Sequence, residues 1–155
     1  MTRKILYGVQ GTGQGHISRA RSVAHALRDY DVDVTWLFSG RPKDRFFDME
    51  PFGHFKHREG LTMVTEAGKM KYRKTALGVS PATFIKDATS LDLDPYDLIV
   101  CDYEPVTSWA CKARGREIIG IGHQYGFGKN TPITGNTPMS RLVTVSYTHL
   151  TLPTK

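Results

Sequence analysis

One stretch of the sequence constrains the fold more than any other: the motif Gly-Thr-Gly-Gln-Gly-His at residues 11–16. It follows a short apolar run at residues 4–10, which is typical of a buried strand. From Ile17 to Leu27 apolar residues recur at helical spacing, so one stripe of a helix can pack on a sheet. A strand, a glycine-rich turn and a helix in this order predict the first unit of a parallel α/β fold. Glycines in such a turn permit positive φ and let backbone N–H groups approach an anion at the helix N-terminus.

Strands and helices continue to alternate along the chain. Apolar runs bounded by glycine and proline predict strands at residues 32–38, 54–58, 61–65, 97–101 and 117–121. Helical segments are predicted at residues 43–49, 81–90 and 105–113. This alternation predicts right-handed βαβ crossovers, and therefore an α/β fold with a Rossmann-like, doubly wound parallel sheet. The length of 155 residues suits one such domain.

The glycine motif does not complete either of the two common nucleotide-binding fingerprints. The dinucleotide fingerprint needs a third glycine where this chain has His16, and an acidic residue at the end of the second strand. That strand ends in Phe38-Ser39-Gly40, so NAD is disfavoured. A P-loop is excluded because no Gly-Lys-Ser/Thr follows the motif. We therefore predict no cofactor; a turn that merely lets helix and strand pack is the structural alternative.

The chain carries a formal net charge of +6 and has a pI near 9.4, which indicates an anionic partner. Nucleic acid is not expected, because the basic residues are dispersed and no RNA-binding signature is present. A phosphorylated small molecule or an acidic membrane face fits the charge better. One basic segment could rest on anionic lipid or hold a lipid-linked phosphate, although a solvated loop is the simpler explanation. It contains Lys69, Met70, Lys71, Tyr72, Arg73 and Lys74.

The sequence also predicts where the protein works and what it does not bind. No stretch approaches the roughly 20 apolar residues that cross a bilayer, and the first residues run directly into a strand pattern rather than a signal peptide. We therefore expect a cytoplasmic protein, peripheral on the inner membrane face if the basic segment binds lipid. Cys101 and Cys111 lack metal-ligand spacing, so we expect two buried thiols and no metal.

Polar side chains follow the last two predicted strands. Asp102, Tyr103 and Glu104 come directly after the strand at residues 97–101, and His123 and Gln124 follow the strand at residues 117–121. Ligands of open α/β sheets bind beyond the carboxyl ends of the strands, at the point where the strand order reverses. The sequence therefore predicts that these two clusters converge with the glycine motif in one cleft.

Three segments resemble the GT-B glycosyltransferases, notably the inverting enzymes that form lipid II and an uncharacterised bacterial and archaeal relative. They are residues 5–20, with the glycine motif and Ser18-Arg19-Ala20, then Cys101-Asp-Tyr-Glu-Pro105 and Gly120-Ile-Gly-His-Gln124. The lipid II enzymes place two glycines together before the histidine, whereas this chain reads Gly-Gln-Gly-His. The resemblance implies the N-terminal, acceptor-side half of a two-domain GT-B architecture, whose C-terminal half would hold the nucleotide-sugar donor.

The implied reaction is inverting transfer of a hexosyl or N-acetylhexosaminyl group from a nucleotide diphosphate sugar to a hydroxyl acceptor, with lipid-linked acceptors among the candidates. Inverting transfer benefits from a base that removes the acceptor proton, and His16 is the best candidate; its alternative role is to cap the first helix or orient the turn. Asp102 or Glu104 is expected to orient His16 or to accept the proton itself. The residues expected to bind substrate are Gly11, Thr12, Gly13, Gln14, Gly15, Arg19, His123 and Gln124.

The last residues differ in kind from the rest. Residues 145–154 resemble a translated sequencing adapter, so we expect a native domain over residues 1–144 and a non-native tail over residues 145–155. The alternative is a genuine C-terminal end. It leads to a second functional hypothesis, an acceptor-binding subunit that recruits a separate donor-binding chain. A third hypothesis is a nucleotide-sugar epimerase of GT-B shape.

Overall fold

The computed structural model describes residues 1–61, 65–66, 69–70 and 80–122. Their main feature is a five-stranded sheet in the order β3-β2-β1-β6-β7, in which every neighbouring pair is parallel. The strands are β1 (Arg3–Gln10), β2 (Val32–Ser39), β3 (Lys56–His57), β6 (Leu98–Asp102) and β7 (Ile119–Gly120). The predicted α/β fold with a Rossmann-like parallel sheet is confirmed.

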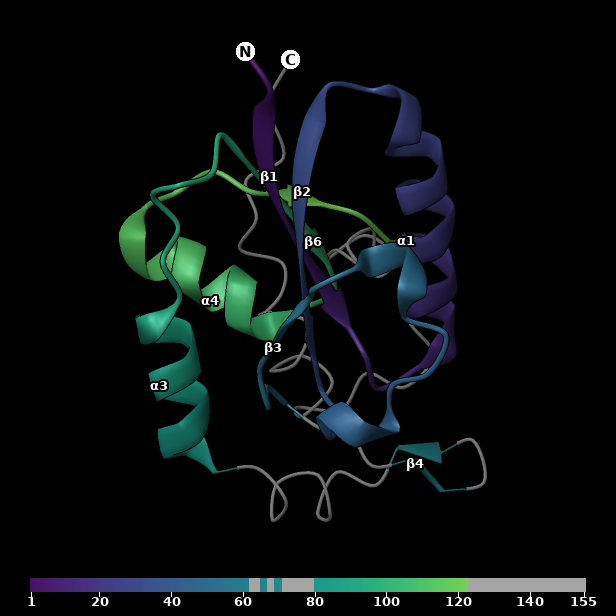
Figure 1. The fold of residues 1–155 in the computed structure, drawn as a ribbon. Coiled ribbons are helices and arrows are strands. Elements are labelled where there is room, and N and C mark those ends of the chain that lie inside the picture. The colour runs from purple at the N-terminus through teal and green to yellow at the C-terminus, as the bar shows by residue number, and fades with distance from the viewer. Residues whose placement is uncertain (62–64, 67–68, 71–79, 123–155) are drawn as a thin grey trace, which may run out of the picture.

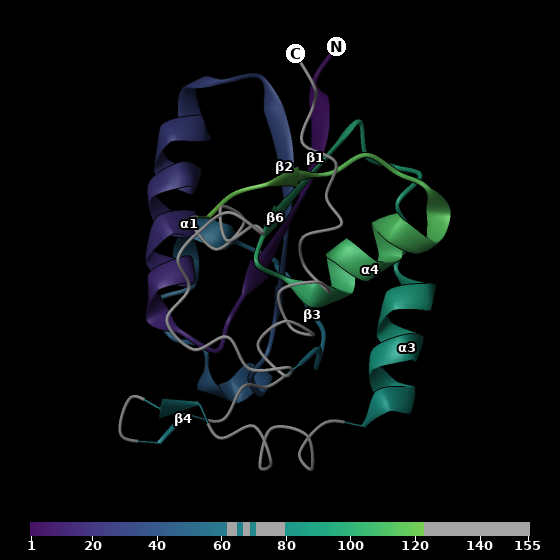
Figure 2. The same cartoon turned by 180° about the vertical axis from the view of Figure 1, so that it is seen from behind.

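Helices cover both faces of this sheet, as a doubly wound fold requires (Figures 1 and 2). Helix α1 (Gln14–Ala26) lies on one face, and helices α3 (Pro81–Ser90) and α4 (Pro105–Arg114) lie on the other. A short 3₁₀ turn, Leu27–Asp29, follows α1. The layers are thus helix, sheet and helix, which leaves the carboxyl ends of the strands as the open edge where loops meet.

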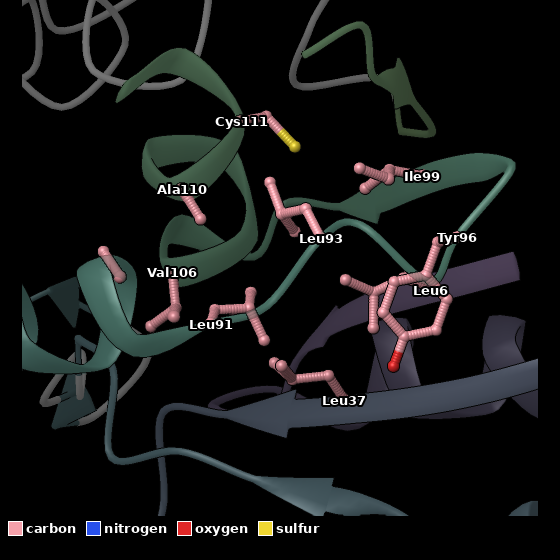
Figure 3. Packing of buried hydrophobic residues seen from close by; sticks show 10 residues of the cluster. Leu6, Leu37, Leu91, Leu93, Tyr96, Ile99, Val106, Ala110 and Cys111 are labelled. Carbon is pink, nitrogen blue, oxygen red and sulfur yellow. The ribbon is translucent and has the colours of Figure 1, made fainter. Parts of the chain in front are cut away.

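Each face of the sheet has its own hydrophobic cluster. On the α3 and α4 side, Leu6, Leu37 and Ile99 from three adjacent strands meet the buried side chains of Leu91 and Val106 (Figure 3). The cluster on the α1 side is richer in aromatic rings: its buried members are Ile5, Tyr7, Val9, Ile17, Ala20, Trp36, Phe38, Phe52 and Val100. Alternate residues of β1 therefore point to opposite clusters, as the pleat of a strand requires.

Side chains of the protein cap the N-termini of helices α3 and α4, but not that of α1. Ser80 caps α3, since its hydroxyl accepts from the backbone N–H of Thr83, and Glu104 caps α4. Helix α4 ends at Gly115, whose φ of 62° is the left-handed conformation typical of a helix end. Helix α1, by contrast, follows Gly13 and has neither a side-chain cap nor an acidic residue in its first turn.

Several predicted elements differ from those observed. The prediction of a helix at residues 43–49 is wrong. The segment forms a 3₁₀ turn at Lys43–Arg45, and a second 3₁₀ turn follows at Glu50–Phe52. Between the two turns, Asp48 adopts a φ of 53°. The edge strands β3 and β7 are shorter than expected, with two residues each.

A second, two-stranded sheet pairs β4 (Thr65–Glu66) antiparallel with β5 (Lys69–Met70). Most of the predicted basic segment, residues 71–74, lies outside the described residues. None of the described helices combines the length and the apolar character that a membrane-spanning segment needs.

Candidate active site

The candidate site lies at the carboxyl ends of β1 and β6, where the strand order reverses. The chain leaves β1 for β2 and β3 on one side of the sheet, whereas β6 and β7 lie on the other. Gly11 to Gly13 follow β1, and Tyr103 and Glu104 follow β6. This is the position at which open α/β sheets bind ligands, and the structure brings two of the three expected segments together there.

Three side chains form the charged centre of the site. The Nδ1–H of His16 donates to Asp102 Oδ1 over 2.6 Å, and Arg19 Nη1 donates to the same oxygen over 2.9 Å. Asp102 is fully buried at the end of β6, whereas 14% of the His16 side chain and 31% of the Arg19 side chain are exposed. Because the carboxylate accepts from Nδ1, the neutral imidazole carries its lone pair on Nε2. His16 is therefore set up to accept a proton at Nε2.

Tyr103 completes the surroundings of His16, a role that the sequence motifs did not predict. Its ring lies nearly parallel to the imidazole, with an interplanar angle of 6° and 5.9 Å between ring centres. Its backbone φ of 56° falls in the left-handed region, which is uncommon for a residue with a side chain. Such conformations concentrate at functional sites, because the surrounding structure must hold them.

Steric packing requires glycine at the first glycine position of the motif, but not at the other two. Gly11 is buried, and a Cβ there would lie 2.6 Å from the Phe46 ring and 2.7 Å from the Ser39 carbonyl oxygen. A Cβ on exposed Gly13 or Gly15 would meet nothing within 4 Å. Packing therefore explains Gly11 but leaves the other two unexplained.

The glycines of the motif do not use the conformational freedom that glycine permits. None of them is among the described residues with positive φ. Gly13 is extended, with φ −113°, and helix α1 begins at the next residue. Gly15 and His16 are thus in the first helical turn, whose N–H groups have no partner within the helix and no side-chain cap among the described residues.

Glu104, expected to act in catalysis or acceptor contact, is placed as the cap of α4. It is fully buried: Oε1 accepts from the Ser39 hydroxyl over 2.6 Å and from Val106 N–H over 2.8 Å, and Oε2 accepts from Thr107 N–H over 2.7 Å. Burial raises the pKa of Glu104, and the hydrogen bonds from Ser39, Thr107 and Val106 counteract part of that rise. This geometry does not favour contact with an acceptor.

A buried polar network ties this cap to the glycine motif. The Ser39 hydroxyl oxygen also lies 3.4 Å from Gln10 Oε1, and Gln10 Nε2 donates to Thr12 Oγ1 over 2.9 Å. Thr12 in turn donates to the Gly40 carbonyl oxygen over 3.2 Å. Thr12, predicted to bind substrate, thus uses its side chain to hold the motif in place.

A second guanidinium lies beside the motif. Arg41 Nη2 donates to the Thr12 carbonyl oxygen over 3.1 Å, and its guanidinium carbon lies 5.4 Å from the centre of the Phe46 ring. Arg41 therefore places a positive charge beside the start of α1, whereas the Arg19 guanidinium is paired with Asp102. An anion at the start of α1 would meet backbone N–H groups, with the Arg41 guanidinium beside it.

A comparison with known families places this geometry in context. A family model described as Glycosyl transferase family 1 matches residues 3–134. The chain belongs to glycosyl transferase family 1. The match includes the glycine motif, the His16–Asp102 pair and Tyr103, and it confirms the resemblance to glycosyltransferases that the sequence motifs suggested.

Solved structures and curated sequences add less to the family 1 assignment. The crystal structure of MurG from Acinetobacter baumannii is similar, with a TM-score of 0.48 and 12% sequence identity. The match covers 76% of this chain and 34% of the MurG chain, so the chain spans about a third of that protein's length. No curated protein matches the chain.

The remaining expected site residues of this family 1 chain have different outcomes. Gln14 is exposed at the first position of α1, beside Gly13 and Gly15. His123 and Gln124 lie outside the described residues. Within the part of the chain that the structure describes, no cluster of three or more His, Cys, Asp or Glu could hold a metal ion.

Proposed function

We propose that the chain is the acceptor-side half of an inverting glycosyltransferase, which moves a hexosyl or N-acetylhexosaminyl group from a nucleotide diphosphate sugar to a hydroxyl acceptor. The observation that carries the proposal is the His16–Asp102 pair at the switch point of the sheet, beside an open glycine motif. Family 1 membership supports glycosyl transfer as the reaction class. The donor sugar belongs, in this proposal, to a C-terminal half of GT-B shape.

The His16–Asp102 pair provides general base catalysis in this reaction. Nε2 of His16 takes the proton of the acceptor hydroxyl while its oxygen forms a bond to the anomeric carbon of the donor. The bond from that carbon to the nucleotide diphosphate breaks on the opposite side, and the diphosphate leaves with the electron pair. The configuration at the anomeric carbon is therefore inverted. Asp102 holds the imidazole in the tautomer required and stabilises the imidazolium that forms.

Arg19 shares the carboxylate with His16 and has a supporting role. Its guanidinium donates to the oxygen that also accepts from His16. A buried carboxylate without a permanent cation would be costly in its charged form. Arg19 thereby supplies a permanent positive charge beside Asp102 both before and after His16 takes up the acceptor proton.

The glycine motif holds an anionic group of the acceptor. Gly13 and Gly15 leave open space above the first turn of α1, and the helix has no side-chain cap that would compete for its N–H groups. Arg41 adds positive charge nearby. A phosphate or diphosphate bound here would place a sugar hydroxyl of the same molecule near His16. This favours a phosphate-linked acceptor, and lipid-linked sugar diphosphates belong to that class.

The test is the variant His16→Ala in the enzyme that contains both halves, with turnover measured at saturating donor and acceptor. Loss of a general base predicts a fall of at least about 100-fold. His25→Ala is the matched control, because His25 is an exposed residue in the last turn of the same helix. Turnover of His16→Ala within a few-fold of the parent would remove His16 from catalysis.

Two further outcomes separate the competing functions. Transfer activity that appears only after a separate donor-binding chain is added would support the acceptor-binding subunit. Release of a free nucleotide-sugar epimer without any acceptor would support the epimerase. Retained configuration in the product would contradict the single-displacement mechanism.

A further inference from the structure

Two buried polar atoms near the candidate site have no hydrogen-bond partner among the described residues: the Tyr7 hydroxyl oxygen and Asp102 Oδ2. Tyr7 is 2% exposed and Asp102 is fully buried. The other oxygen of Asp102 already accepts from both His16 and Arg19. Buried polar groups in folded proteins are almost always paired, with protein groups or with ordered water. These two atoms therefore require an explanation.

The strand register puts both side chains on the same face of the sheet. Tyr7 pairs with Val100, and Val9 pairs with Asp102, in the parallel ladder of β1 and β6. Side chains alternate along a strand, so Tyr7 and Val100 share the α1 face with Asp102, two residues further along β6. The Tyr7 ring is fixed there by Trp36, whose ring centre lies 4.8 Å away.

The charges around Tyr7 keep its hydroxyl protonated and able to donate. Burial raises the pKa of Tyr7 above its ordinary value, and the negative charge of Asp102 raises it further. Arg19 acts in the opposite direction, and Cys101 adds a smaller upward effect. The strand register and the burial of both groups, rather than this charge effect, place them on the same face of the sheet; they make no direct hydrogen bond.

We propose that Tyr7 is a positioning residue for the His16–Asp102 pair, and that one buried water molecule accepts a hydrogen bond from the Tyr7 hydroxyl and donates one to Asp102 Oδ2. A water with these two partners satisfies the usual requirement of two to four polar contacts for a buried water. With Oδ2 held from β1, the carboxylate cannot rotate, and Oδ1 stays in line with His16 Nδ1. The catalytic meaning of this arrangement rests on the proposed function; the water bridge itself does not.

The charged and titratable groups that face Asp102 come from three elements. Helix α1 contributes His16 and Arg19, which bond to Asp102; β1 contributes Tyr7 on the same face of the sheet; and Tyr103, which follows β6, packs against the His16 ring. Cys101 points to the opposite face, where its Sγ bonds to Glu104 and Ser108. His16 and Arg19 act on Oδ1. Tyr7 is the group among them whose unpaired donor is matched by the unpaired Oδ2.

The test uses the 155-residue chain with isotope-labelled histidine, and it measures exchange of the His16 Nδ1 proton with solvent. Tyr7→Phe removes only the hydroxyl oxygen. Loss of a hydrogen bond that orients a charged group predicts at least about tenfold faster exchange. Tyr96→Phe is the matched control, because Tyr96 is buried in the cluster on the opposite face of the sheet and should leave the exchange unchanged (Figure 3). The His16 signal is assigned by its loss in His16→Gln.

Two measurements can refute the proposal. Exchange in Tyr7→Phe within about threefold of the parent contradicts the positioning role, since a supporting hydrogen bond should slow opening by more. On the unmutated chain, a magnetisation-transfer contact should join the Tyr7 hydroxyl proton to a long-lived water; absence of that contact overturns the bridge even if Tyr7→Phe does not fold.

A double variant shows whether Tyr7 acts through Asp102. In the Asp102→Asn background, adding Tyr7→Phe should leave the His16 ring signals unchanged, because the carboxylate oxygen that Tyr7 supports is gone. An equal effect of Tyr7→Phe in both backgrounds would overturn the proposal. None of these readouts requires donor or turnover, so they are independent of the His16→Ala test: a failed transfer reaction would leave the bridge intact, and a failed bridge would leave general base catalysis untouched.

Discussion

Gly15→Ala should stabilise the fold and weaken the site at the same time. Gly15 is the second residue of α1, it is exposed, and a Cβ there would meet nothing within 4 Å. Alanine restricts the unfolded chain more than glycine and is a better helix former, so we expect a gain of about 0.5–1 kcal/mol in the free energy of unfolding. For a domain of this size, that gain raises the melting temperature by about 1–4 °C.

The same methyl group should hinder an anion at the helix N-terminus. In the proposed function, the open space at Gly15 is occupied by the phosphate of the acceptor. The probe is inorganic pyrophosphate, titrated into the 155-residue chain while backbone amide signals are followed by NMR. We expect binding at least about tenfold weaker in Gly15→Ala, which corresponds to about 1.4 kcal/mol. Urea denaturation gives the stability of the same sample from its midpoint at unchanged slope.

Gly15 is a cleaner position than Gly13 for this test. Gly13 precedes α1 as its cap, and alanine is disfavoured at that position for reasons unrelated to a ligand. A stabilised Gly15→Ala chain that binds pyrophosphate as tightly as the parent would refute the anion site. A destabilised chain would refute the inference that the fold has no need of glycine there.

Other predictions concern the packing beneath the site and the basic segment. Gly8→Ala should lower the free energy of unfolding by about 1–3 kcal/mol, because its Cβ would lie 2.5 Å from Thr107 Oγ1; urea denaturation measures this. Glu104→Ala should lower it by about 2–4 kcal/mol through loss of a helix cap and of partners for buried donors, whereas the exposed Glu117→Ala should change it little. Because burial raises the pKa of Glu104, the native state holds its proton more tightly than the unfolded chain, so in thermal melts the parent should lose stability relative to Glu104→Gln as the pH rises above the ordinary pKa of a glutamate. The basic segment contains the cations Lys69, Lys71, Arg73 and Lys74. Replacing all four by glutamine should abolish binding to anionic vesicles at low salt, and unchanged binding would contradict the membrane prediction.

The layout of the site could be predicted because it depends on strands that short stretches of sequence identify. The apolar run before Gly11 and the run before Asp102 are long enough to identify two central strands, and parallel strands must end at the same edge. That rule alone brings His16 and Asp102 into proximity. Edge elements were less predictable: β3 and β7 have two residues each, and their short pairing depends on neighbours rather than on their own sequence.

The roles of individual side chains depended on tertiary contacts that no local pattern contains. Glu104 was a candidate to orient His16 or to accept the acceptor proton because it follows a strand, but Pro105 at the first helical position was a signal that its predecessor caps a helix. Tyr103 gave no signal, since its positive φ is imposed by the turn between β6 and α4. Arg41 likewise contacts a residue of another segment, since it donates to the Thr12 carbonyl oxygen.

Helix α1 links the two halves of the proposed mechanism, and this explains why the Gly15→Ala experiment is informative. Its first turn offers free N–H groups to an anion, while His16 in that same turn carries the base and Arg19, three residues later, holds the carboxylate. A phosphate bound at the turn would therefore fix its attached sugar relative to Nε2 through one rigid element. A stronger helix with a blocked turn should keep the His16–Asp102 hydrogen bond and lose the anion. If Gly15→Ala instead altered exchange of the His16 Nδ1 proton as well, the binding and base functions would share more than the helix, and the separation of roles argued here would be wrong.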